Sequence, residues 1–514
     1  MEKNQRNIFM FLVLILSALV MRVICILISE TVNGDSAILA LMAKHVAELR
    51  DFPIYMPRVH YVGSLMVYVG AILFKVFGVS SITYGFLGLF TSCLWVIFIA
   101  LLARRTLDRS GYIFTILLAL FPNFNLLLFS LSTWGVHAEN FVFVSLLLLL
   151  LIKWNDGDYR GGHFFSFLFG LCSGAGFWST PGVIPCLLTI FTVFIIKSTV
   201  QRSFSAGFFF FAAGFLLGYM PSIIYNLQFP MATIFRMGGR ILDLDRSVLS
   251  SPDIVHIVFM KILWRISTFP ASLSRIPRLI HELIGMPNLL LFVVSIVWVY
   301  KSHFLGFLKE RRLDGLAILM IFVIWFVVFY VTLVGEDAAR YMSSLCAISP
   351  VLIGGLLSRL GKRSKTLCIS VVMLVLLYNI CTTAYSFSHI KVMHYPELAK
   401  WLLSRDMRYG YSDSRISYAV EFDTSEKILI SPTIFHPDFS DRWPEETSRV
   451  RAAENTIYIL NRNFPEALAK VQKRFRQLSV AYKKDVVEEF VVYHDLSRRV
   501  YPEELGLIEL LSKR

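Results

Sequence analysis

The segment ETVNGDSAILALMAKHVAELRD, residues 30–51, places an aspartate at the start of a helix-like pattern. The residues behind Asp35 follow the spacing of one helix face, at Ile38, Leu41, Met42, His45, Val46 and Leu49. This stripe predicts a helix that lies along a membrane surface. The positive end of the helix dipole would favour an ionised carboxylate at Asp35. Asp35 is therefore either a simple helix cap or a charged group available for chemistry.

The next segment, FPIYMPRVHYVG at residues 52–63, brings together a cation, an imidazole and a phenol. Arg58, His60 and Tyr61 follow two prolines and precede a long apolar run that ends at residue 78. Arg58 and His60 are side chains that could bind a phosphate or sugar hydroxyls. The alternative is a connector shaped by its prolines, whose polar groups face lipid headgroups.

His137 and Glu139 lie in the segment LSTWGVHAENF, residues 131–141, at the end of a predicted membrane span. Ionisable groups at membrane depth are costly, and they tend to be functional. The two side chains could therefore bind a polar ligand. The alternative is an interfacial loop that Trp134 anchors.

Arg340 heads a further apolar stretch, in the segment GEDAARYMSS at residues 335–344. Its guanidinium could hold a lipid phosphate through two parallel hydrogen bonds. The alternative is a local ion pair with Glu336 or Asp337.

The elements that must position these residues are membrane helices. Of the 514 residues, 56% are hydrophobic and 17% are charged, and the mean hydropathy is +0.63. A soluble globular protein has about 25% charged residues. The long apolar runs predict an α-helical polytopic membrane protein with eleven spans, at residues 8–28, 83–103, 112–130, 140–153, 163–179, 182–197, 205–225, 287–300, 315–334, 342–358 and 366–387. The first run begins like a signal peptide but continues past Arg22, so we predict a retained helix.

Basic residues gather on one side of these predicted spans. The short loops of that side hold 17 Lys and Arg residues, whereas the short loops of the opposite side hold only Arg340. Such asymmetry assigns the basic side to the cytoplasm and predicts an integral protein of the plasma (inner) membrane with a cytoplasmic N-terminus. The outer face then carries the loop 29–82 with Asp35, the connection 226–286 and the C-terminal tail. The net charge of +14 thus reflects membrane orientation, and no nucleic acid partner is expected.

The chain divides into a membrane part, residues 1–387, and a small soluble α/β domain outside the membrane, residues 388–514. In the tail, YPELAKWLLSRD and FPEALAKVQKRF read as helices, and KILIS, TIYIL and EFVVYH read as strands. Within the connection 226–286, the apolar positions of DIVHIVFMKILWRIS predict an amphipathic helix at the membrane surface. The alternative there is a further span, against which Lys261 and Arg265 argue.

The sequence lacks the motifs by which soluble enzymes bind and use nucleotides. It lacks a P-loop, a dinucleotide fingerprint, the zinc motif His-Glu-x-x-His and the nucleophile elbow Gly-x-Ser-x-Gly. The seven cysteines lie in apolar stretches without CxxC spacing, so we expect neither a zinc site nor a disulfide framework. An enzyme with a site on the outer face would then need an activated donor carried by a lipid.

Taken in order, these segments resemble the C-type (GT-C) glycosyltransferases of bacteria and archaea, relatives of the dolichyl-phosphate-mannose protein mannosyltransferases and the aminoarabinose-to-lipid A transferases. The resemblance covers nearly the whole chain and depends on the order of loose motifs. Those motifs are NGDSAILALMAKHV, PIYMPRVHYVGSLMVYVGAILFKVFGVSS, FWSTPGVIPCLL, GYMPSIIYNL and ARYMSSL. The tail stretch YGYSDSRISYAVEFDTSEKILISP resembles the outer domain of one bacterial subgroup. Within it, Tyr411 and Asp413 are the tail residues to test for a role at the site, and the alternative is that they belong to a turn of a soluble domain.

The resemblance implies transfer of a sugar from a polyprenyl-phosphate donor to a hydroxyl of a lipid, glycan or protein acceptor, with inversion at the anomeric carbon. Asp35 would be the general base. Arg340, with Arg58 or His60, would stabilise the phosphate left on the polyprenyl chain. His137, Glu139 and Tyr61 would bind the sugar or the acceptor.

Two positions depart from the family pattern. The family often has a glutamate after the key aspartate, where this chain has Ser36, and we expect a second acid within GSLMVY, where this chain has Met66. A divalent metal cofactor is therefore doubtful, no metal ligand is assigned, and a mechanism with a single carboxylate is favoured. The alternatives are a transporter or flippase of a lipid-linked glycan, and an inactive scaffold. A transporter should show paired halves, of which the sequence gives no sign.

Overall fold

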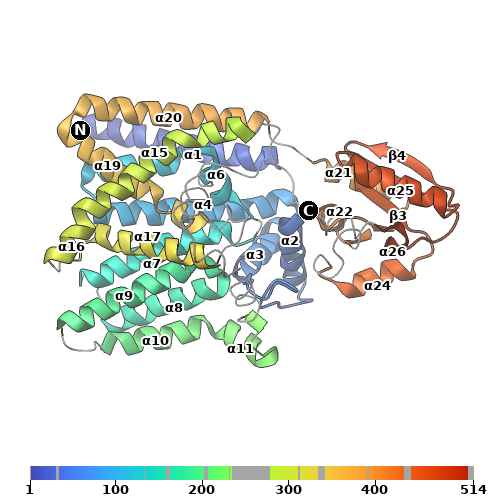
Figure 1. Cartoon of the computed structure of the whole chain (residues 1–514), viewed down its shortest axis with the longest axis horizontal. Helices are drawn as coiled ribbons and strands as arrows, with labels where there is room; N and C mark the ends of the chain where they lie inside the picture. Colours follow the sequence, from blue (N-terminus) through green and yellow to red (C-terminus); the bar gives the residue numbers. More distant parts are fainter. Residues whose placement is uncertain are drawn as a thin grey trace, which may run out of the picture.

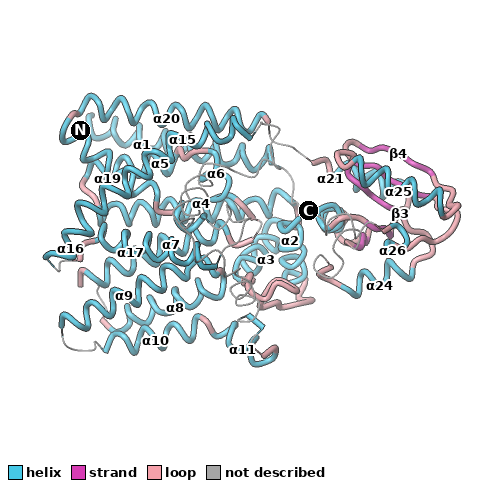
Figure 2. Tube along the Cα trace, viewed as in Figure 1, coloured by secondary structure: helices cyan, strands magenta, loops and turns pink. Residues whose placement is uncertain are grey.

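The computed structural model consists of a large helical bundle and a smaller tail that contains a sheet (Figure 1). It describes residues 2–29, 34–133, 135–157, 162–201, 206–230, 232–233, 278–310, 313–333, 342–389, 393–432 and 441–506. Among the described residues, strands are drawn only in the tail, whereas the first part consists of helices joined by loops (Figure 2). Helices α2 and α3 lie between the bundle and the tail (Figure 1).

The helices of the first part follow in chain order, with gaps where residues are not described. They are α1 (Glu2–Ser29), α2 (Gly34–Ala47), α3 (Leu65–Phe77), α4 (Ser81–Thr106), α5 (Arg109–Leu120), α6 (Phe124–Leu131), α7 (His137–Asn155), α8 (His163–Ser179), η1 (Pro181–Val183), α9 (Ile184–Gln201), α10 (Ala206–Gly218), α11 (Met220–Gln228), α15 (Arg278–Val299), η5 (Tyr300–Phe304), α16 (Leu305–Glu310), α17 (Gly315–Leu333), α18 (Ser343–Cys346), α19 (Ser349–Arg363) and α20 (Lys365–Ser388).

The eleven predicted spans all fall on helices, but the count of eleven is not confirmed. Within the described residues, six helical stretches are long and apolar enough to cross a membrane, and two bent helix pairs raise the number to eight. The apolar parts of α1 and α17, at Val13–Leu27 and Gly315–Tyr330, are shorter. These helices show a multi-pass membrane protein.

The predicted span 112–130 is two helices that meet at an angle of 71°. Pro122 follows α5, and a residue before proline is pushed out of the helical conformation. Asn123 then caps α6, because its Oδ1 accepts a hydrogen bond from the amide of Leu126 at 3.0 Å. The same kind of break, of 54°, separates α10 from α11, where Pro221 lies in the first turn of α11.

A buried arginine stabilises the end of α5. Arg22 of α1 donates hydrogen bonds to the carbonyl oxygens of Ala119 and Leu120, at 2.8 and 2.9 Å. Its Nε donates to Ser92 Oγ at 2.9 Å. Carbonyls at a helix C-terminus lack partners within the helix, and they carry partial negative charge. The Arg22 guanidinium therefore supplies hydrogen-bond donors to the carbonyl groups at the C-terminal end of α5, inside the bundle.

Helices α8 and α10 pack against each other through glycines. A Cβ on Gly170 or Gly174 of α8 would lie 1.9 or 2.1 Å from a carbonyl oxygen of α10. A Cβ on Gly214 or Gly218 of α10 would lie 2.0 or 2.2 Å from a carbonyl oxygen of α8. Small residues four positions apart allow this close approach of two membrane helices.

The tail is a sheet with helices on both faces. Its strands are β1 (Tyr409–Tyr411), β2 (Leu429–Ser431), β3 (Ile457–Asn461), β4 (Lys483–Val487) and β5 (Phe490–His494), in the order β2-β1-β3-β5-β4. Strand β1 pairs in parallel with β2 and β3, and the other two pairs are antiparallel. The helices are α21 (Tyr395–Ser404), α22 (Ser414–Asp423), α24 (Pro444–Ala452), α25 (Pro465–Gln477) and α26 (Pro502–Leu505). The predicted tail helices and strands are thus confirmed, whereas β1 and β4 were not predicted.

Alternate side chains of the central strand pack on opposite faces of the sheet. Tyr458 and Leu460 of β3 belong to a core with residues of α24, α25 and α26. Ile457 and Ile459 belong to a second core with residues of α21 and α22, and this core continues into α2 and α3. One face of the tail therefore docks on the two helices that follow α1.

Helix α2 is enclosed by protein on all sides. Every residue from Ser36 to Val46 is buried, and α3 and α22 both pack against the helix. The prediction that its apolar stripe rests on the membrane surface is therefore wrong for this helix. Apart from Leu49, which lies beyond the end of α2 and is exposed, the residues of the stripe contact protein, and α22 packs against the same helix.

Candidate functional site

Asp35 lies in the first turn of α2 and is exposed, whereas the eleven residues that follow it are buried. The preceding Gly34 has a positive φ of 45°, which a residue with a side chain rarely adopts. A Cβ on Gly34 would lie 3.4 Å from Arg415 Cγ of the tail. The start of α2 thus contacts the tail, and the Asp35 carboxylate beside this contact is accessible.

A tail residue, Arg442, is the charged neighbour of Asp35. The Arg442 side chain is buried, with 6% of its surface exposed. Its Nη1 donates a hydrogen bond to the carbonyl of Pro57 at 3.1 Å, and its amide donates to Tyr418 Oη at 2.7 Å. Burial lowers the pKa of Arg442, and the Asp35 carboxylate is the largest of the opposing influences. Arg442 was not predicted, because nothing in the sequence near residue 442 indicates a contact with residue 57.

The loop between α2 and α3 holds Arg58 and His60 in an unusual conformation. Both residues have positive φ, of 63° and 60°. This left-handed conformation costs a residue with a side chain on the order of 1–3 kcal/mol. The loop is closed by a bridge between Tyr55 and Gly63. Strain of this kind is found where a backbone must present its side chains in one direction.

Helix α11 holds this loop in place. The hydroxyl groups of Tyr55 and Ser222 lie 2.5 Å apart, and so do His60 Nδ1 and Tyr225 Oη. The rings of Tyr55 and Tyr225 also meet edge to face, with centroids 4.9 Å apart. His60 is therefore turned toward α11.

Electrostatic influences couple two aspartates and two arginines where the tail adjoins this loop. Arg58 of the loop favours the ionised form of Asp441 in the tail, and it also acts on Arg442. Burial raises the pKa of Asp441, which a hydrogen bond with Thr447 and the Arg58 cation oppose in part. Tyr61 is half-buried and packs against the core shared by α2, α3 and the tail. Of the predicted site, Asp35 and Arg58 are thus both coupled to Arg442, and the tail supplies the remaining charges.

A cavity lies one helical turn from Asp35, on the side of Leu39. Its empty volume is about 340 Å³, open solvent included, and it is lined by Leu39, Gly63, Met66, Val67, Tyr84, Leu87, Thr91, Ser132, Thr133, Gly135, Ala138 and Glu139. Leu39 is four residues beyond Asp35 and therefore shares its helix face. Thr133 Oγ1 donates to Ser36 Oγ at 3.3 Å. The lining is mostly apolar, with hydroxyl groups at Tyr84, Thr91, Ser132 and Thr133 and a carboxyl group at Glu139.

Glu139 is one of the residues that line this cavity. Its side chain is 5% exposed, and its carboxylate accepts a hydrogen bond from Ser179 Oγ at the end of α8. His137, which was predicted beside it, does not line the cavity. Its buried ring packs against Phe129, with centroids 5.6 Å apart.

Two other predicted elements lie outside the described residues. They are Arg340 and the amphipathic segment 253–267. Of the tail residues, Tyr411 is fully buried in β1 and Asp413 caps α22, accepting hydrogen bonds from the amides of Arg415 and Ile416. Both have structural roles in the tail.

Among the described residues, one group of three side chains has the spacing of metal ligands. It consists of His394, Glu488 and Glu489, whose ligand atoms lie within 4.8 Å of one another. His394 Nδ1 and Glu489 Oε2 are 3.0 Å apart, and the group is largely exposed on the tail. No residue around Asp35 belongs to this group.

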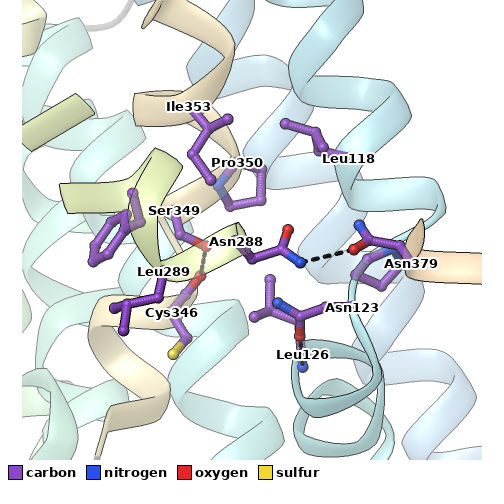
Figure 3. Close-up of a pocket in the computed structure, with 12 residues that line it drawn as sticks. Leu118, Asn123, Leu126, Asn288, Leu289, Cys346, Ser349, Pro350, Ile353 and Asn379 are labelled. Carbon is purple, nitrogen blue, oxygen red and sulfur yellow. Dashed lines mark hydrogen bonds between the residues drawn. The ribbon is translucent and has the colours of Figure 1, made fainter. Parts of the chain in front are cut away.

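A second cavity, of about 500 Å³, lies at the bend between α5 and α6 (Figure 3). Asn288 of α15 and Asn379 of α20 point toward each other there, with Asn288 Nδ2 donating to Asn379 Oδ1 at 2.8 Å (Figure 3). Asn379 in turn donates to the carbonyl of Phe121 at 3.2 Å. This cavity contains no residue that was predicted for the site.

Comparisons with known proteins give matches in structure alone. No family model and no curated protein sequence matches the chain. Among solved structures, apo ArnT from Cupriavidus metallidurans superposes with a TM-score of 0.61, covering 98% of this chain and 99% of that one at 11% identity. ArnT bound to undecaprenyl phosphate superposes with a TM-score of 0.54, at 12% identity over 95% and 98% of the two chains.

The archaeal oligosaccharyltransferase AglB from Archaeoglobus fulgidus, in complex with an inhibitory peptide and a dolichol-phosphate, gives a TM-score of 0.51. The match covers 93% of this chain and 74% of AglB at 12% identity. ArnT and AglB are GT-C glycosyltransferases that depend on polyprenyl phosphates. The chain has the GT-C fold. The expectation drawn from its motifs is thereby confirmed for the fold, over nearly the whole length of the GT-C protein ArnT.

Proposed function

We propose that this GT-C protein is a glycosyltransferase that moves a sugar from a polyprenyl-phosphate donor to a hydroxyl acceptor at the outer face of the membrane. The observation that carries the proposal is the accessible Asp35 carboxylate at the end of a buried helix, one turn from a cavity that presents hydroxyl groups and Glu139. Arg442, and Arg58 with it, add positive charge that acts on this site. A base, a cavity for a polar ligand and cations for a phosphate are the parts that this reaction needs.

In the proposed reaction the acceptor oxygen attacks the anomeric carbon of the donor sugar. The bond from that carbon to the phosphate oxygen breaks, and its electron pair leaves with the polyprenyl phosphate. Asp35 takes the proton of the acceptor hydroxyl, a contribution of roughly 10²–10⁴ in rate. Attack from the side opposite the leaving phosphate gives inversion.

The positive charge of Arg58 on the loop suits the polyprenyl phosphate that leaves in the proposed reaction. Arg58 is half-buried, and a partly desolvated guanidinium binds a phosphate more strongly than a fully exposed one does. We assign the donor phosphate to Arg58, together with Arg340 by its place in the sequence. His60 joins α11 to this loop and would hold the loop at the phosphate, through its contact with Tyr225.

The cavity behind Asp35 is proposed to take the sugar. Glu139 is a buried carboxylate, and the cavity also presents Thr91, Ser132 and Thr133. A carboxylate that accepts hydrogen bonds from sugar hydroxyls binds them more strongly than a neutral group does. Tyr61 lies near Arg442 and would contact the acceptor, whereas His137 supports the wall of the cavity through Phe129.

We further propose that residues 1–387 form the membrane domain and that residues 388–514 form an extracytoplasmic domain above it. The 17 basic residues in the loops of one side support a cytoplasmic N-terminus in the plasma (inner) membrane. The tail docks on α2, so it lies on the same side of the membrane as Asp35.

Transfer and transport can be separated in one assay. The purified protein in proteoliposomes receives a panel of undecaprenyl-phosphate monosaccharides with a radiolabelled sugar, and a cell-envelope extract serves as acceptor. We expect label in the acceptor and free undecaprenyl phosphate in equal amount. Label that crosses the bilayer with its bond to phosphate intact would support the transporter alternative. No turnover of any panel member would support the inactive scaffold.

A further inference from the structure

We propose that Ser179, at the end of α8, is a positioning residue for Glu139, and that it sets this carboxylate in a fixed place relative to the loop that carries Arg58. The proposal rests on the proposed function, in which Glu139 binds the donor sugar and Arg58 binds the donor phosphate. It assigns a role in the site to the segment FWSTPG, residues 177–182.

Helix α8 ends at Ser179 for a reason that lies in the sequence. Pro181 follows two residues later, and the residue before a proline is pushed out of the helical conformation. Thr180 is accordingly extended, with φ of −152° and ψ of 134°. The last carbonyl groups of a helix lack partners within it, so that of Ser179 is available to another element.

The outer loop is that element. The amide of Gly63 donates to the carbonyl of Ser179 at 3.1 Å. Trp178 Nε1 donates to the carbonyl of Ile54 at 3.0 Å. A Cβ on Gly63 would collide with the carbonyl oxygen of Trp178, so this close approach requires a glycine. Because Ile54 and Gly63 lie on either side of Arg58 in the chain, the end of α8 holds the loop at both of its ends.

The side chain of Ser179 points the other way, to the carboxylate. Ser179 Oγ donates a hydrogen bond to Glu139 Oε2. Ser179 is fully buried, and Glu139 is 5% exposed. Glu139 and Gly63 line the same cavity. Ser179 therefore contacts the loop through its backbone and the sugar-binding carboxylate through its hydroxyl.

The neighbouring residues hold the two helices together independently of Ser179. Thr180 Oγ1 donates to Asn140 Oδ1 at 2.7 Å, and Asn140 Nδ2 donates to Ser343 Oγ of α18 at 2.8 Å. These three residues are buried, and buried polar groups that are hydrogen-bonded in this way make a structure rigid. Loss of the Ser179 hydroxyl should therefore release the Glu139 side chain while α7 and α8 stay in place.

The bond to Ser179 also leaves Glu139 able to bind a ligand. Among the described side chains, only that of Ser179 hydrogen-bonds to the Glu139 carboxylate, and it occupies Oε2. Oε1 is then available to a hydroxyl of the donor sugar. A carboxylate held through one oxygen presents the other in a defined direction, and such alignment lowers the cost of ordering when the ligand binds.

The test uses the full-length protein in the assay above, with the panel donor that is turned over. Ser179→Ala should raise KM for that donor about fivefold and leave kcat within about twofold, because a binding contact is weakened. The inhibition constant of free undecaprenyl phosphate should change less than about twofold, since the phosphate site remains. Ser179→Cys fills the same space with a weak donor and should raise KM as Ser179→Ala does.

The matched control is Ser173→Ala. Ser173 is fully buried on the same helix, and its hydroxyl bonds to the carbonyl of Phe169 of that helix. Its loss should leave KM unchanged. An equal rise in KM for Ser173→Ala would show a general effect of changing α8, which would overturn the positioning role.

A double-mutant cycle separates positioning of Glu139 from an effect on the loop. In a Glu139→Ala background, Ser179→Ala should cause no further rise in KM. Rises that multiply would overturn the positioning role, and so would an inhibition constant of undecaprenyl phosphate that rises as much as KM. Should Ser179→Ala fail to fold, Ser179→Cys carries the cycle. An unchanged KM in Glu139→Ala would instead overturn the sugar-binding role of Glu139, and no turnover by the unaltered protein would overturn the proposed function itself.

Discussion

At the scale of single residues, the proposed site depends on carboxylates in contrasting environments. Asp35 is exposed at the start of a buried helix, whereas Glu139 is buried in the wall of the adjacent cavity. An accessible carboxylate can exchange a proton with a substrate, and a buried one is better suited to hold hydroxyls in place. The two acids can therefore divide catalysis and binding between them.

Glu139→Gln should raise KM for the donor about tenfold, or ~1.4 kcal/mol, because an oxygen that can accept hydrogen bonds is replaced by an amide nitrogen that only donates, in a side chain of nearly the same shape. The measurement is the initial rate of label transfer against donor concentration. Ser145→Ala is the control, since Ser145 is buried on the same helix but bonds only to carbonyls of its own helix. An unchanged KM in Glu139→Gln would remove Glu139 from the binding site.

The sequence located Asp35, Arg58 and Glu139 as residues of interest, because each departs from the apolar pattern around it. It did not locate Arg442, which lies 385 residues from its partner Pro57 in the chain. A tail arginine in a polar segment looks like any surface residue until the fold places it. For the same reason the sequence could not distinguish His137, which packs against Phe129, from Glu139, which lines the cavity.

At the scale of elements, the eleven apolar segments and the main tail elements were predictable from hydrophobic spacing alone. The bend at Pro122 had a local signal in the Pro-Asn pair, but the length of the apolar run concealed it. Strand β4 begins with two lysines and lies at the edge of the sheet, where charge is favoured and apolar alternation is weak. Strand β1 is only three residues long.

The contact between α8 and α10 can be tested through its glycines. Gly174→Leu should destabilise the protein by several kcal/mol, because even a Cβ there would lie 2.1 Å from the carbonyl of Phe215. The measurement is the thermal midpoint in detergent. Gly306→Leu is the control, since a Cβ at Gly306 meets no atom within 4 Å. A variant at Gly174 as stable as the control would contradict the close packing of the two helices.

Docking of the tail should depend on pH through two glutamates. Burial alone would raise the pKa of Glu426, but hydrogen bonds from His45, Lys44 and Arg50 outweigh it and hold the pKa well below its usual range. The stability that ionised Glu426 contributes to the docked tail is therefore present above the ordinary pKa of glutamate and is lost on acidification. Burial, together with the negative charge of Glu426, raises the pKa of Glu446 to about 7. The stability that protonated Glu446 contributes is therefore lost as pH rises through 7.

Glu446→Gln should therefore stabilise the tail by about 1 kcal/mol at pH 8 and by less at pH 5.5, because it removes a carboxylate that must ionise while buried. The thermal midpoint at the two pH values measures this. Glu445→Gln removes the same charge from the exposed neighbouring position and should change the midpoint equally at both. A pH-independent effect of Glu446→Gln would contradict the assignment.

At the scale of the whole molecule, the tail and the outer loop form one body around α2, and the helical bundle lies on the other side of that helix (Figure 1). Segments far apart in the sequence meet at this junction, since the hydroxyl of Tyr55 in the outer loop contacts Ser222 of α11 and the carbonyl of Pro57 accepts a hydrogen bond from Arg442 of the tail.

The two ends of the helical bundle are expected to face opposite sides of the membrane. After Cys381, the exposed native cysteine among the described residues, is changed to Ser, Lys473→Cys in the tail should react with an impermeant reagent on intact spheroplasts. Lys362→Cys, at the end of α19 in a basic loop, should react only after lysis. The reverse pattern would place Asp35 in the cytoplasm and contradict the proposed function.

The most direct test of the account is the rate of sugar transfer by Asp35→Asn in proteoliposomes supplied with the labelled undecaprenyl-phosphate donor. Asp51→Asn is the matched control, because Asp51 is an exposed carboxylate of the same loop that caps the amide of Phe52. We expect Asp35→Asn to lose about 10²–10⁴ in rate while Asp51→Asn keeps its activity. Equal rates for Asp35→Asn and the unaltered protein would show that this carboxylate does not remove the acceptor proton.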